Sequence, residues 1–220
     1  MSDVEKFDFK MLEERLYSDI ICDVLDEMGF RGQAMREDVR PLYPEAVVVG
    51  RAMTILSVDV YKEEANTLDM EMEAVDSLKR GDVAVTCTNR STRAAMWGEL
   101  LSTASRARGA RGAIIDGLSR DVKRIVGMRF PVFATGIVPY SSNGRCEVIA
   151  YNCEIECGGV RVRPGDLVFG DIDGIVVAPK ESADEVVNRA LEKVQKENIT
   201  RTELQRGLLL REVYKKYGTL

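Results

Sequence analysis

The chain has 220 residues, 45% of them hydrophobic and 30% charged, which is ordinary for a globular protein that buries a core. Its net charge is −5 and no block of basic residues occurs, which argues against nucleic acid as a partner. The sequence contains no histidine, which excludes Ser-His-Asp and Cys-His catalysis, histidine-ligated metals and a histidine base.

Neither a membrane segment nor a leader is predicted. No apolar run reaches the roughly 18 residues of a membrane span. The N-terminal residues lack the charged-then-apolar pattern of a signal peptide. We therefore expect a cytoplasmic protein with no membrane partner. The five cysteines form no Cys-x-x-Cys pair, so we expect small buried side chains rather than a zinc site.

The N-terminal part predicts a helix followed by strands. Apolar residues recur every three or four positions over residues 8–29, which predicts an amphipathic helix with a break at Ser18. Two strand-like runs follow, over residues 46–50 and 52–60, with a bulge or bend expected at Gly50.

The next elements are a helix and a strand. Residues 63–79 predict a helix that turns Met70, Met72 and Val75 toward the core, where methionine is a common filler. The run Asp82 to Cys87 then predicts a buried strand.

A polar loop over residues 88–95 is a natural wall for a site. A helix is expected over residues 99–108 and a strand from Ala113. A second helix is expected to begin near Ser119, which can cap it and would place Asp121 in the first turn. The central part of the chain therefore consists of two consecutive βα units.

The C-terminal part predicts short strands and then a long helix. The strands are expected at residues 130–134, 146–151, 153–157, 160–163, 166–170 and 174–178. Asp171-x-Asp173-Gly174 is expected to be a hairpin turn, because no glutamate completes a calcium loop. The charged helix over residues 181–217 is expected to break near residues 198–200. No repeat or linker is present, so residues 1–220 are expected to form a single domain.

The two βα units predict a site. If their strands are parallel, both helix starts lie at one sheet edge, which would then carry Glu99, Arg120 and Asp121. The free backbone N–H groups of the first of these helices belong to Gly98, Glu99, Leu100 and Leu101. Two carboxylates, a guanidinium and an anion-binding helix start suit a hard cation that holds a small carboxylate substrate. The alternative is two well-capped helices and a surface ion pair.

Several motifs together resemble one protein family, and the resemblance extends over nearly the whole chain. They are Val49-Gly50-Arg51-Ala52, Gly81-Asp82-Val83, Gly98-Glu99-Leu100-Leu101, Asp116-Gly117-x-x-Arg120-Asp121, Pro164-Gly165-Asp166 and Asp171-x-Asp173-Gly174. This set resembles the RraA-like family, which includes regulators of ribonuclease activity A, 4-hydroxy-4-methyl-2-oxoglutarate aldolases and oxaloacetate decarboxylases.

The resemblance implies an α/β fold, a swivelling-domain-like β/β/α sandwich with a central mixed sheet and a long C-terminal helix. It implies a homotrimer or homohexamer with sites between subunits. Glu197 is similar to a family glutamate that enters the site from the neighbouring subunit. Arg124 stands where the family often has an acid.

The resemblance also implies an activity. Asp121 would bind Mg²⁺ or Mn²⁺, Glu99 would orient a water on the metal, and Arg120 would donate to the keto oxygen of the substrate. The expected enzyme is a class II-type pyruvate aldolase, an oxaloacetate decarboxylase, or both, which cleaves a C–C bond of a small 2-keto acid through a pyruvate enolate. A water on the metal, held by Glu99 or Glu197, is the expected base.

Three alternatives remain. A lysine Schiff-base mechanism is disfavoured because no lysine falls at the predicted site. A methyltransferase is disfavoured because no glycine-rich loop follows the first strand. A non-catalytic regulator that binds an RNA-processing enzyme is the main alternative. The presence of Asp121, which the regulator branch can lack, favours the enzyme.

Overall fold

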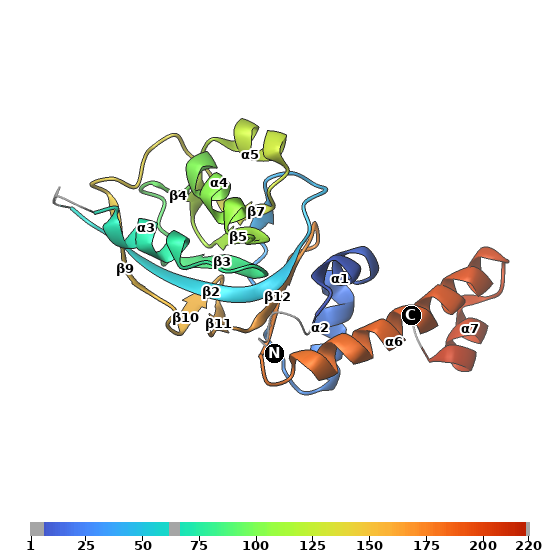
Figure 1. The fold of residues 1–220 in the computed structure, drawn as a ribbon. Helices are drawn as coiled ribbons and strands as arrows, with labels where there is room; N and C mark the ends of the chain where they lie inside the picture. Colours follow the sequence, from blue (N-terminus) through green and yellow to red (C-terminus); the bar gives the residue numbers. More distant parts are fainter. Residues whose placement is uncertain (1–6, 62–66, 219–220) are drawn as a thin grey trace.

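A curled mixed sheet forms the centre of the computed structural model, which describes residues 7–61 and 67–218 (Figure 1). The strand order is β1 (Arg40–Pro41), β7 (Val132–Ala134), β5 (Gly112–Ile115), β3 (Asp82–Cys87), β2 (Val48–Asp59), β12 (Leu167–Gly170) and β13 (Ile175–Ala178), and β9 (Cys146–Tyr151) also pairs with β2. The neighbours β7, β5, β3 and β2 run parallel, whereas β1, β12, β13 and β9 pair antiparallel. The predicted central mixed sheet is confirmed.

The strand β2 is continuous through Gly50, so the bulge or bend expected there is wrong. A Cβ at this position would lie 2.5 Å from the carbonyl oxygen of Gly81 and 2.8 Å from Cγ2 of Val83. Glycine is therefore needed for the close approach of β2 to the start of β3. The register of β2 shifts only where it pairs with β9, between Leu56 and Ser57.

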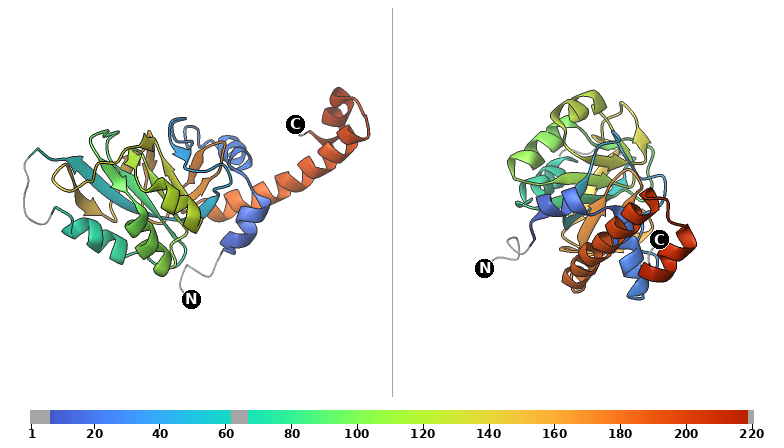
Figure 2. Two further views of the ribbon diagram at one scale, coloured as in Figure 1. Left: turned by 90° about the horizontal axis from the view of Figure 1, so that it is seen from above. Right: turned by 90° about the vertical axis from the view of Figure 1, so that its right-hand side faces the viewer.

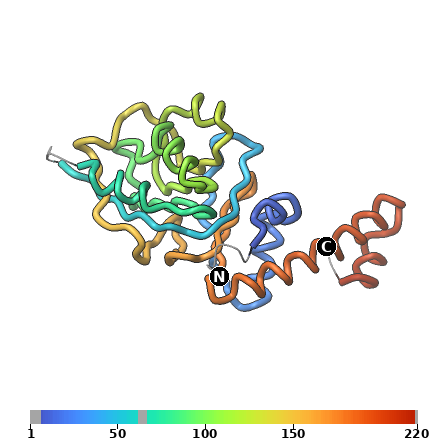
Figure 3. The backbone as a smooth tube through the Cα atoms, viewed as in Figure 1, coloured from blue at the N-terminus to red at the C-terminus, as the bar shows by residue number. Residues whose placement is uncertain are grey.

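Two layers cover the sheet. The helices α3 (Asp69–Asp76), α4 (Glu99–Ala107) and α5 (Val122–Met128) lie on one face, and the hairpin of β10 (Ile155–Cys157) and β11 (Val160–Val162) packs on the other (Figures 1 and 3). Alternate residues of β2 serve the two layers, because Met53 and Ile55 pack on the helix side and Val48 and Ala52 on the hairpin side. The predicted β/β/α arrangement is confirmed.

The orientation of α3 differs from the prediction. Met70 and Met72 are 36% and 51% exposed, whereas Glu71, Ala74 and Val75 are buried. The inward orientation expected for the two methionines is therefore wrong. The first residues of the expected helix over 63–79 lie outside the described residues, and α3 itself ends at Asp76.

A second, three-stranded parallel sheet was not predicted. It consists of β4 (Ala95–Trp97), β6 (Leu118–Ser119) and β8 (Gly136–Ile137), which follow β3, β5 and β7 along the chain. Ser119 is the last residue of β6 and not the cap of α5, so the expected cap is wrong. The residue that precedes α5 is Asp121, whose φ of 58° lies in the left-handed region.

The N-terminal helices pack against the β12–β13 end of the sheet. The predicted break lies between α1 (Phe9–Arg15) and α2 (Ser18–Glu27). The carboxylate of Asp171 accepts hydrogen bonds of 2.7 Å from both the backbone N–H and the hydroxyl of Ser18. The predicted hairpin turn at residues 171–174 is confirmed, and through Asp171 it also fixes the start of α2.

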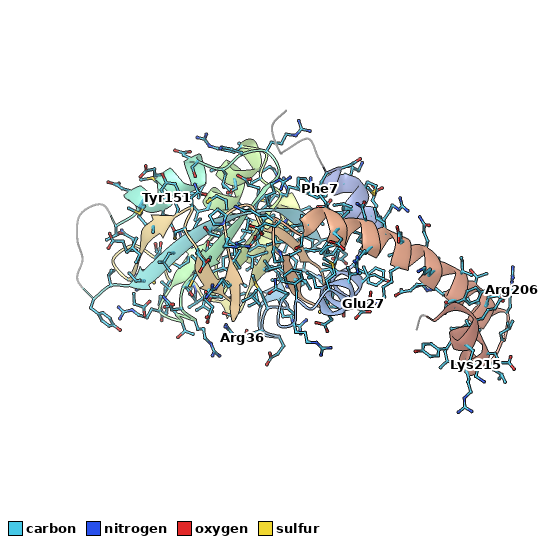
Figure 4. The ribbon with its side chains drawn as sticks, turned by 90° about the horizontal axis from the view of Figure 1, so that it is seen from below. Phe7, Glu27, Arg36, Tyr151, Arg206 and Lys215 are labelled. Atoms are coloured by element: carbon cyan, nitrogen blue, oxygen red, sulfur yellow. The ribbon has the colours of Figure 1, made fainter. Side chains whose placement is uncertain are left out.

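The C-terminal helix α6 (Ala183–Gln205) runs unbroken through residues 198–200, so the expected break there is wrong. The chain instead reverses at Gly207, whose φ is 89°, and α7 (Leu210–Tyr217) folds back beside α6 (Figure 2). The helices α6 and α7 form an arm that extends away from the sheet (Figure 2). Arg206 and Lys215 lie near the far end of this arm, and Tyr151 lies at the opposite end of the molecule (Figure 4). In the described part of the chain, no helix has the length and apolar character needed to cross a bilayer.

Candidate active site

The small sheet brings two helix starts together. Strands β4 and β6 pair in parallel, with Ala95 opposite Leu118 and Trp97 opposite Ser119. The residues that follow these strands, Gly98-Glu99 and Arg120-Asp121, therefore lie side by side. The backbone N–H of Arg120 donates to the carbonyl oxygen of Trp97 over 2.9 Å and fixes this arrangement. The main-sheet strands β3 and β5 are also parallel, as the prediction of a shared edge requires.

The carboxylate of Asp121 contacts the start of α4 and the side chain of the preceding residue, Arg120. Its Oδ2 accepts a hydrogen bond of 3.3 Å from the backbone N–H of Glu99 and lies 3.6 Å from Nε of Arg120. Both side chains are about two-fifths exposed, at 38% for Arg120 and 40% for Asp121. The backbone of Asp121 is left-handed, which is unfavourable for most residues other than glycine. Such conformations concentrate at functional sites.

Gly98 leaves space for the pair. A Cβ at this position would lie 2.8 Å from Oδ2 of Asp121 and 3.3 Å from Nε of Arg120, which is too close for the first atom. The hydroxyl of Ser102 fixes the backbone at Gly98. It donates to the carbonyl oxygen of Gly98 and accepts from the indole N–H of Trp97, each over 2.9 Å. The hydroxyl of Ser102 thus joins the two residues that precede α4.

A cavity of about 280 Å³ opens at these residues, close to the lower end of the range for small-ligand pockets. Most of its lining is apolar, and the polar side chains are few. It is lined by Leu68, Glu71, Met72, Ala95, Met96, Trp97, Gly98, Leu100, Leu101, Arg120, Asp121, Ser141 and Ser142. An apolar cavity with a few convergent polar groups is the usual form of a small-molecule site.

Glu71 is a cavity residue that the sequence prediction missed. The residue is 8% exposed, and its Oε1 is buried with no hydrogen-bond partner among the described residues. Burial raises the pKa of its carboxyl to about 7, against a smaller lowering by the charge of Arg120. A signal was present in the sequence, because Glu71 shares a helical face with Ala74, Val75 and Leu78 at spacings of three, four and seven.

The side chains of the two predicted glutamates, Glu99 and Glu197, have partners outside the cavity. The hydroxyl of Thr103 donates to the carboxylate of Glu99 over 2.8 Å, and Glu99 meets Asp121 through its backbone N–H. Glu197 lies on α6, where its carboxylate accepts a hydrogen bond from Tyr17 and lies 3.9 Å from Arg201. Burial and the neighbouring Glu197 raise the pKa of Tyr17 to about 12. The structure of one chain does not bring Glu197 to the cavity.

A cation at this site would have one protein carboxylate. Among residues 7–61 and 67–218, no group of three or more acidic or cysteine side chains is placed to enclose a metal. Asp121 nevertheless suits a hard cation, because within the described residues both of its side-chain contacts fall on Oδ2 and leave Oδ1 for a ligand. Mg²⁺ commonly binds through one or two carboxylates and keeps several waters. Arg124, in the position of an expected further acid, is exposed on α5.

The chain is similar to proteins of one known family. Residues 19–177 match the model of a family described as RraA-like, Aldolase/RraA. Protein DlpA of Legionella pneumophila is 28% identical over 197 residues, which cover 90% of this chain but 32% of DlpA. A Halalkalibacterium halodurans protein named "Putative 4-hydroxy-4-methyl-2-oxoglutarate aldolase" is 30% identical over 173 residues, 79% of this chain and 77% of that protein.

The fold also matches a solved structure. Streptomyces coelicolor RraAS2, described as "an unusual member of the RNase ES inhibitor RraA protein family", superposes with a TM-score of 0.79 at 28% identity. The match covers 89% of this chain and 96% of RraAS2. The chain thus spans nearly the whole of RraAS2 but about a third of the length of DlpA.

Proposed function

The chain belongs to the RraA-like (Aldolase/RraA) family, and from this premise we propose that it is a lyase that cleaves a C–C bond of a small 2-keto acid. The observation that carries the proposal is the cavity in which Arg120 and Asp121 meet the start of α4. The name of the Halalkalibacterium halodurans relative supports an aldolase.

The start of α4 would bind the carboxylate of the substrate. Leu100 and Leu101 line the cavity, and their backbone N–H groups lie in the first turn, where a helix supplies no acceptor. The N–H of Glu99 is engaged by Asp121, whereas those of Leu100 and Leu101 have no acceptor among the described residues. Free amides and the positive end of the helix dipole together favour an anion.

Arg120 would hold the keto oxygen. Cleavage of the C–C bond leaves its electron pair on the keto-acid fragment, and the keto oxygen becomes an enolate oxygen. A guanidinium beside this oxygen stabilises the developing charge, and electrostatic stabilisation of this kind usually contributes more to catalysis than any other single effect. Loss of a 4-hydroxy-linked fragment and loss of carbon dioxide from oxaloacetate give the same pyruvate enolate. We therefore assign both the 4-hydroxy-4-methyl-2-oxoglutarate aldolase and the oxaloacetate decarboxylase reactions to this site.

Asp121 would hold Mg²⁺ or Mn²⁺, which makes the proposed enzyme a class II-type aldolase. When bound, the cation supplies a Lewis acid that polarises the carbonyl of the keto acid. Glu99 would support the site from beside Asp121, and its N–H already orients that carboxylate. Gly98 keeps the space between Asp121 and Arg120 open.

We further propose a homotrimer or homohexamer in which Glu197 reaches the cavity of a neighbouring subunit. The arm that carries Glu197 extends away from the sheet of its own chain (Figure 2). Its tip exposes apolar side chains that a subunit contact would cover, Leu208, Leu209 and Leu210 at 38%, 67% and 55%.

The test is pyruvate release, followed with lactate dehydrogenase over a panel of oxaloacetate and 4-hydroxy-2-keto acids. Activity should require Mg²⁺ or Mn²⁺, disappear with a chelator, and be lost in Asp121→Asn. Pyruvate release that is unaffected by both the chelator and Asp121→Asn would refute the role of Asp121. A wild-type protein that is inactive on the whole panel would refute the lyase.

A regulator that binds an RNA-processing enzyme is the second candidate, and the similarity to RraAS2 favours it. This function needs no metal and no cavity, so a regulator should bind its partner equally well after Asp121→Asn. Catalytic inactivity together with metal-independent binding of an RNA-processing enzyme would favour this candidate over the lyase.

A further inference from the structure

We propose that Glu71 is the proton-transfer residue of this cavity, which takes the hydroxyl proton of a 4-hydroxy-2-keto acid and returns it to the enolate carbon. The inference rests on the proposed lyase function and adds a catalytic group to it. Glu71 thereby takes the role expected for a water held by Glu99 or Glu197.

Glu71 lies in the same cavity as the proposed substrate-binding groups. It lines the cavity from α3, whereas Arg120 and Asp121 line it from the turn between β6 and α5. A substrate held by Arg120 and the start of α4 would therefore share its cavity with the carboxyl of Glu71. The carboxylate of Asp121, the proposed cation ligand, contacts Glu99 and Arg120 within the described chain. These contacts do not include Glu71, so the two carboxyl groups can have separate roles.

The carboxyl of Glu71 lacks a hydrogen-bond partner at one of its oxygens. Buried polar atoms in folded proteins nearly always have such a partner. Oε1 of Glu71 is buried without one among the described residues, and the residue as a whole is more than nine-tenths buried. An unpaired buried carboxyl is costly unless a ligand completes it. The hydroxyl group of a substrate is the kind of donor that would do so.

The electrostatic surroundings suit proton transfer. A catalytic acid or base is most effective when its pKa is near the working pH, and burial raises the pKa of Glu71 to about 7. Arg120 is the one charged group that opposes this rise among the described residues. Besides Glu71, the ionisable groups on α3 and on the elements packed against it are Asp69, Glu73 and Asp76 of α3, Glu99 and Arg106 of α4, and Cys146, Glu147 and Tyr151 of β9.

Several of these groups are engaged elsewhere. Tyr151 donates to Glu73 over 3.1 Å, Arg106 donates to a backbone carbonyl, and Arg108 binds Asp76 at 2.6 Å. Among the described residues, Arg120 is the charge that lowers the pKa of Glu71.

The proposed step balances. The Glu71 carboxylate accepts the proton of the substrate C4 hydroxyl as the C3–C4 bond breaks, and the C4 oxygen becomes a carbonyl. The electron pair of the broken bond enters the pyruvate fragment as its enolate. The carboxyl of Glu71 then donates its proton to C3 of the enolate, which gives pyruvate and restores the carboxylate. No oxidant, reductant or further reactant is needed.

The two reactions assigned to this site should differ in their need for Glu71. Decarboxylation of oxaloacetate forms the same enolate but has no hydroxyl proton to remove. Water can supply the final proton to C3. Glu71→Gln should therefore impair cleavage of 4-hydroxy-2-keto acids much more than carbon dioxide release from oxaloacetate. A role confined to folding or to substrate binding would affect both reactions alike.

The experiment compares wild type, Glu71→Gln, Glu71→Asp and the control Glu73→Gln, which removes an exposed carboxyl two residues away on α3. We expect Glu71→Gln to lower kcat for 4-hydroxy-2-keto acid cleavage by more than about 100-fold, a typical contribution of a general base. Its loss of oxaloacetate decarboxylation should be at least about tenfold smaller, because that reaction has no hydroxyl proton to remove. Glu71→Asp should retain more cleavage activity than Glu71→Gln because it keeps a carboxyl, and Glu73→Gln should match wild type in both reactions.

The pH dependence gives a second readout. Cleavage requires the ionised carboxylate, so kcat/KM of wild type should fall below about pH 7, and this limb should be absent from the residual activity of Glu71→Gln. Equal losses in the two reactions, or no loss in either, would overturn the role of Glu71 while leaving the lyase intact. Inactivity of wild type on every substrate would instead refute the lyase, and the role of Glu71 with it.

Discussion

The raised pKa of Glu71 predicts a measurable effect on stability that is independent of catalysis. Its carboxyl titrates near 7 in the folded chain and near its ordinary value of 4.5 in the unfolded chain. Between these values the folded state binds more protons, so the free energy of unfolding falls as the pH rises. The difference of about 2.5 between the two pKa values corresponds to about 3 kcal/mol, because each pKa unit is worth about 1.4 kcal/mol. This stability is present below about pH 4.5 and is lost by about pH 8.

Glu71→Gln removes this titration and keeps the shape of the side chain. Urea unfolding of wild type, Glu71→Gln and Glu73→Gln should be measured at several pH values and one protein concentration, because subunit association would alter apparent stability. From about pH 4.5 to pH 8, wild type should lose about 3 kcal/mol relative to Glu71→Gln, whereas Glu73→Gln should follow wild type. Parallel curves for wild type and Glu71→Gln would show that the carboxyl is not desolvated and would refute the reasoning.

Three further substitutions test the site itself. Gly98→Ala should lower kcat/KM by more than about tenfold with unchanged circular dichroism, because the new Cβ would lie 2.8 Å from Oδ2 of Asp121. Arg120→Lys should lower kcat by about 100-fold or more, since a point charge replaces a planar fork of donors; near-normal turnover in a steady-state assay would contradict this. Asp121→Asn should abolish metal-stimulated pyruvate release and leave the melting temperature within a few degrees, because asparagine tolerates the left-handed backbone found here. Isothermal titration with Mn²⁺ should show the loss of binding directly.

The two βα units were predictable because their signals are local. Val83 to Cys87 and Ala113 to Ile115 are short apolar runs, and both are buried parallel strands. The small sheet of β4, β6 and β8 was not predictable in this way. Its strands have two or three residues, too few for any periodicity, and they form only because the main-sheet strands that precede them are already aligned.

The orientation of α3 was mistaken for a different physical reason. The expectation that apolar side chains face inward placed Met70 and Met72 in the core, and they are instead among the exposed apolar residues. The buried face includes Glu71, a carboxyl that lines a cavity rather than packing in the core. Rules of hydrophobic pattern fail where a functional group requires burial. Glu71 is an ionisable residue at a position where the helical spacing predicts an apolar one, which is the kind of exception that marks a candidate site.

The charge balance of the cavity connects its three ionisable side chains. Arg120 neutralises Asp121 at 3.6 Å and also lowers the pKa of Glu71, so one guanidinium acts on two carboxyls. If both carboxyls were ionised, the cavity would carry a net negative charge and would repel an anionic keto acid. A proton on Glu71 or a cation on Asp121 removes that excess. An anionic substrate should therefore bind more tightly when either is present, and in Glu71→Gln its affinity should depend less on pH than in wild type.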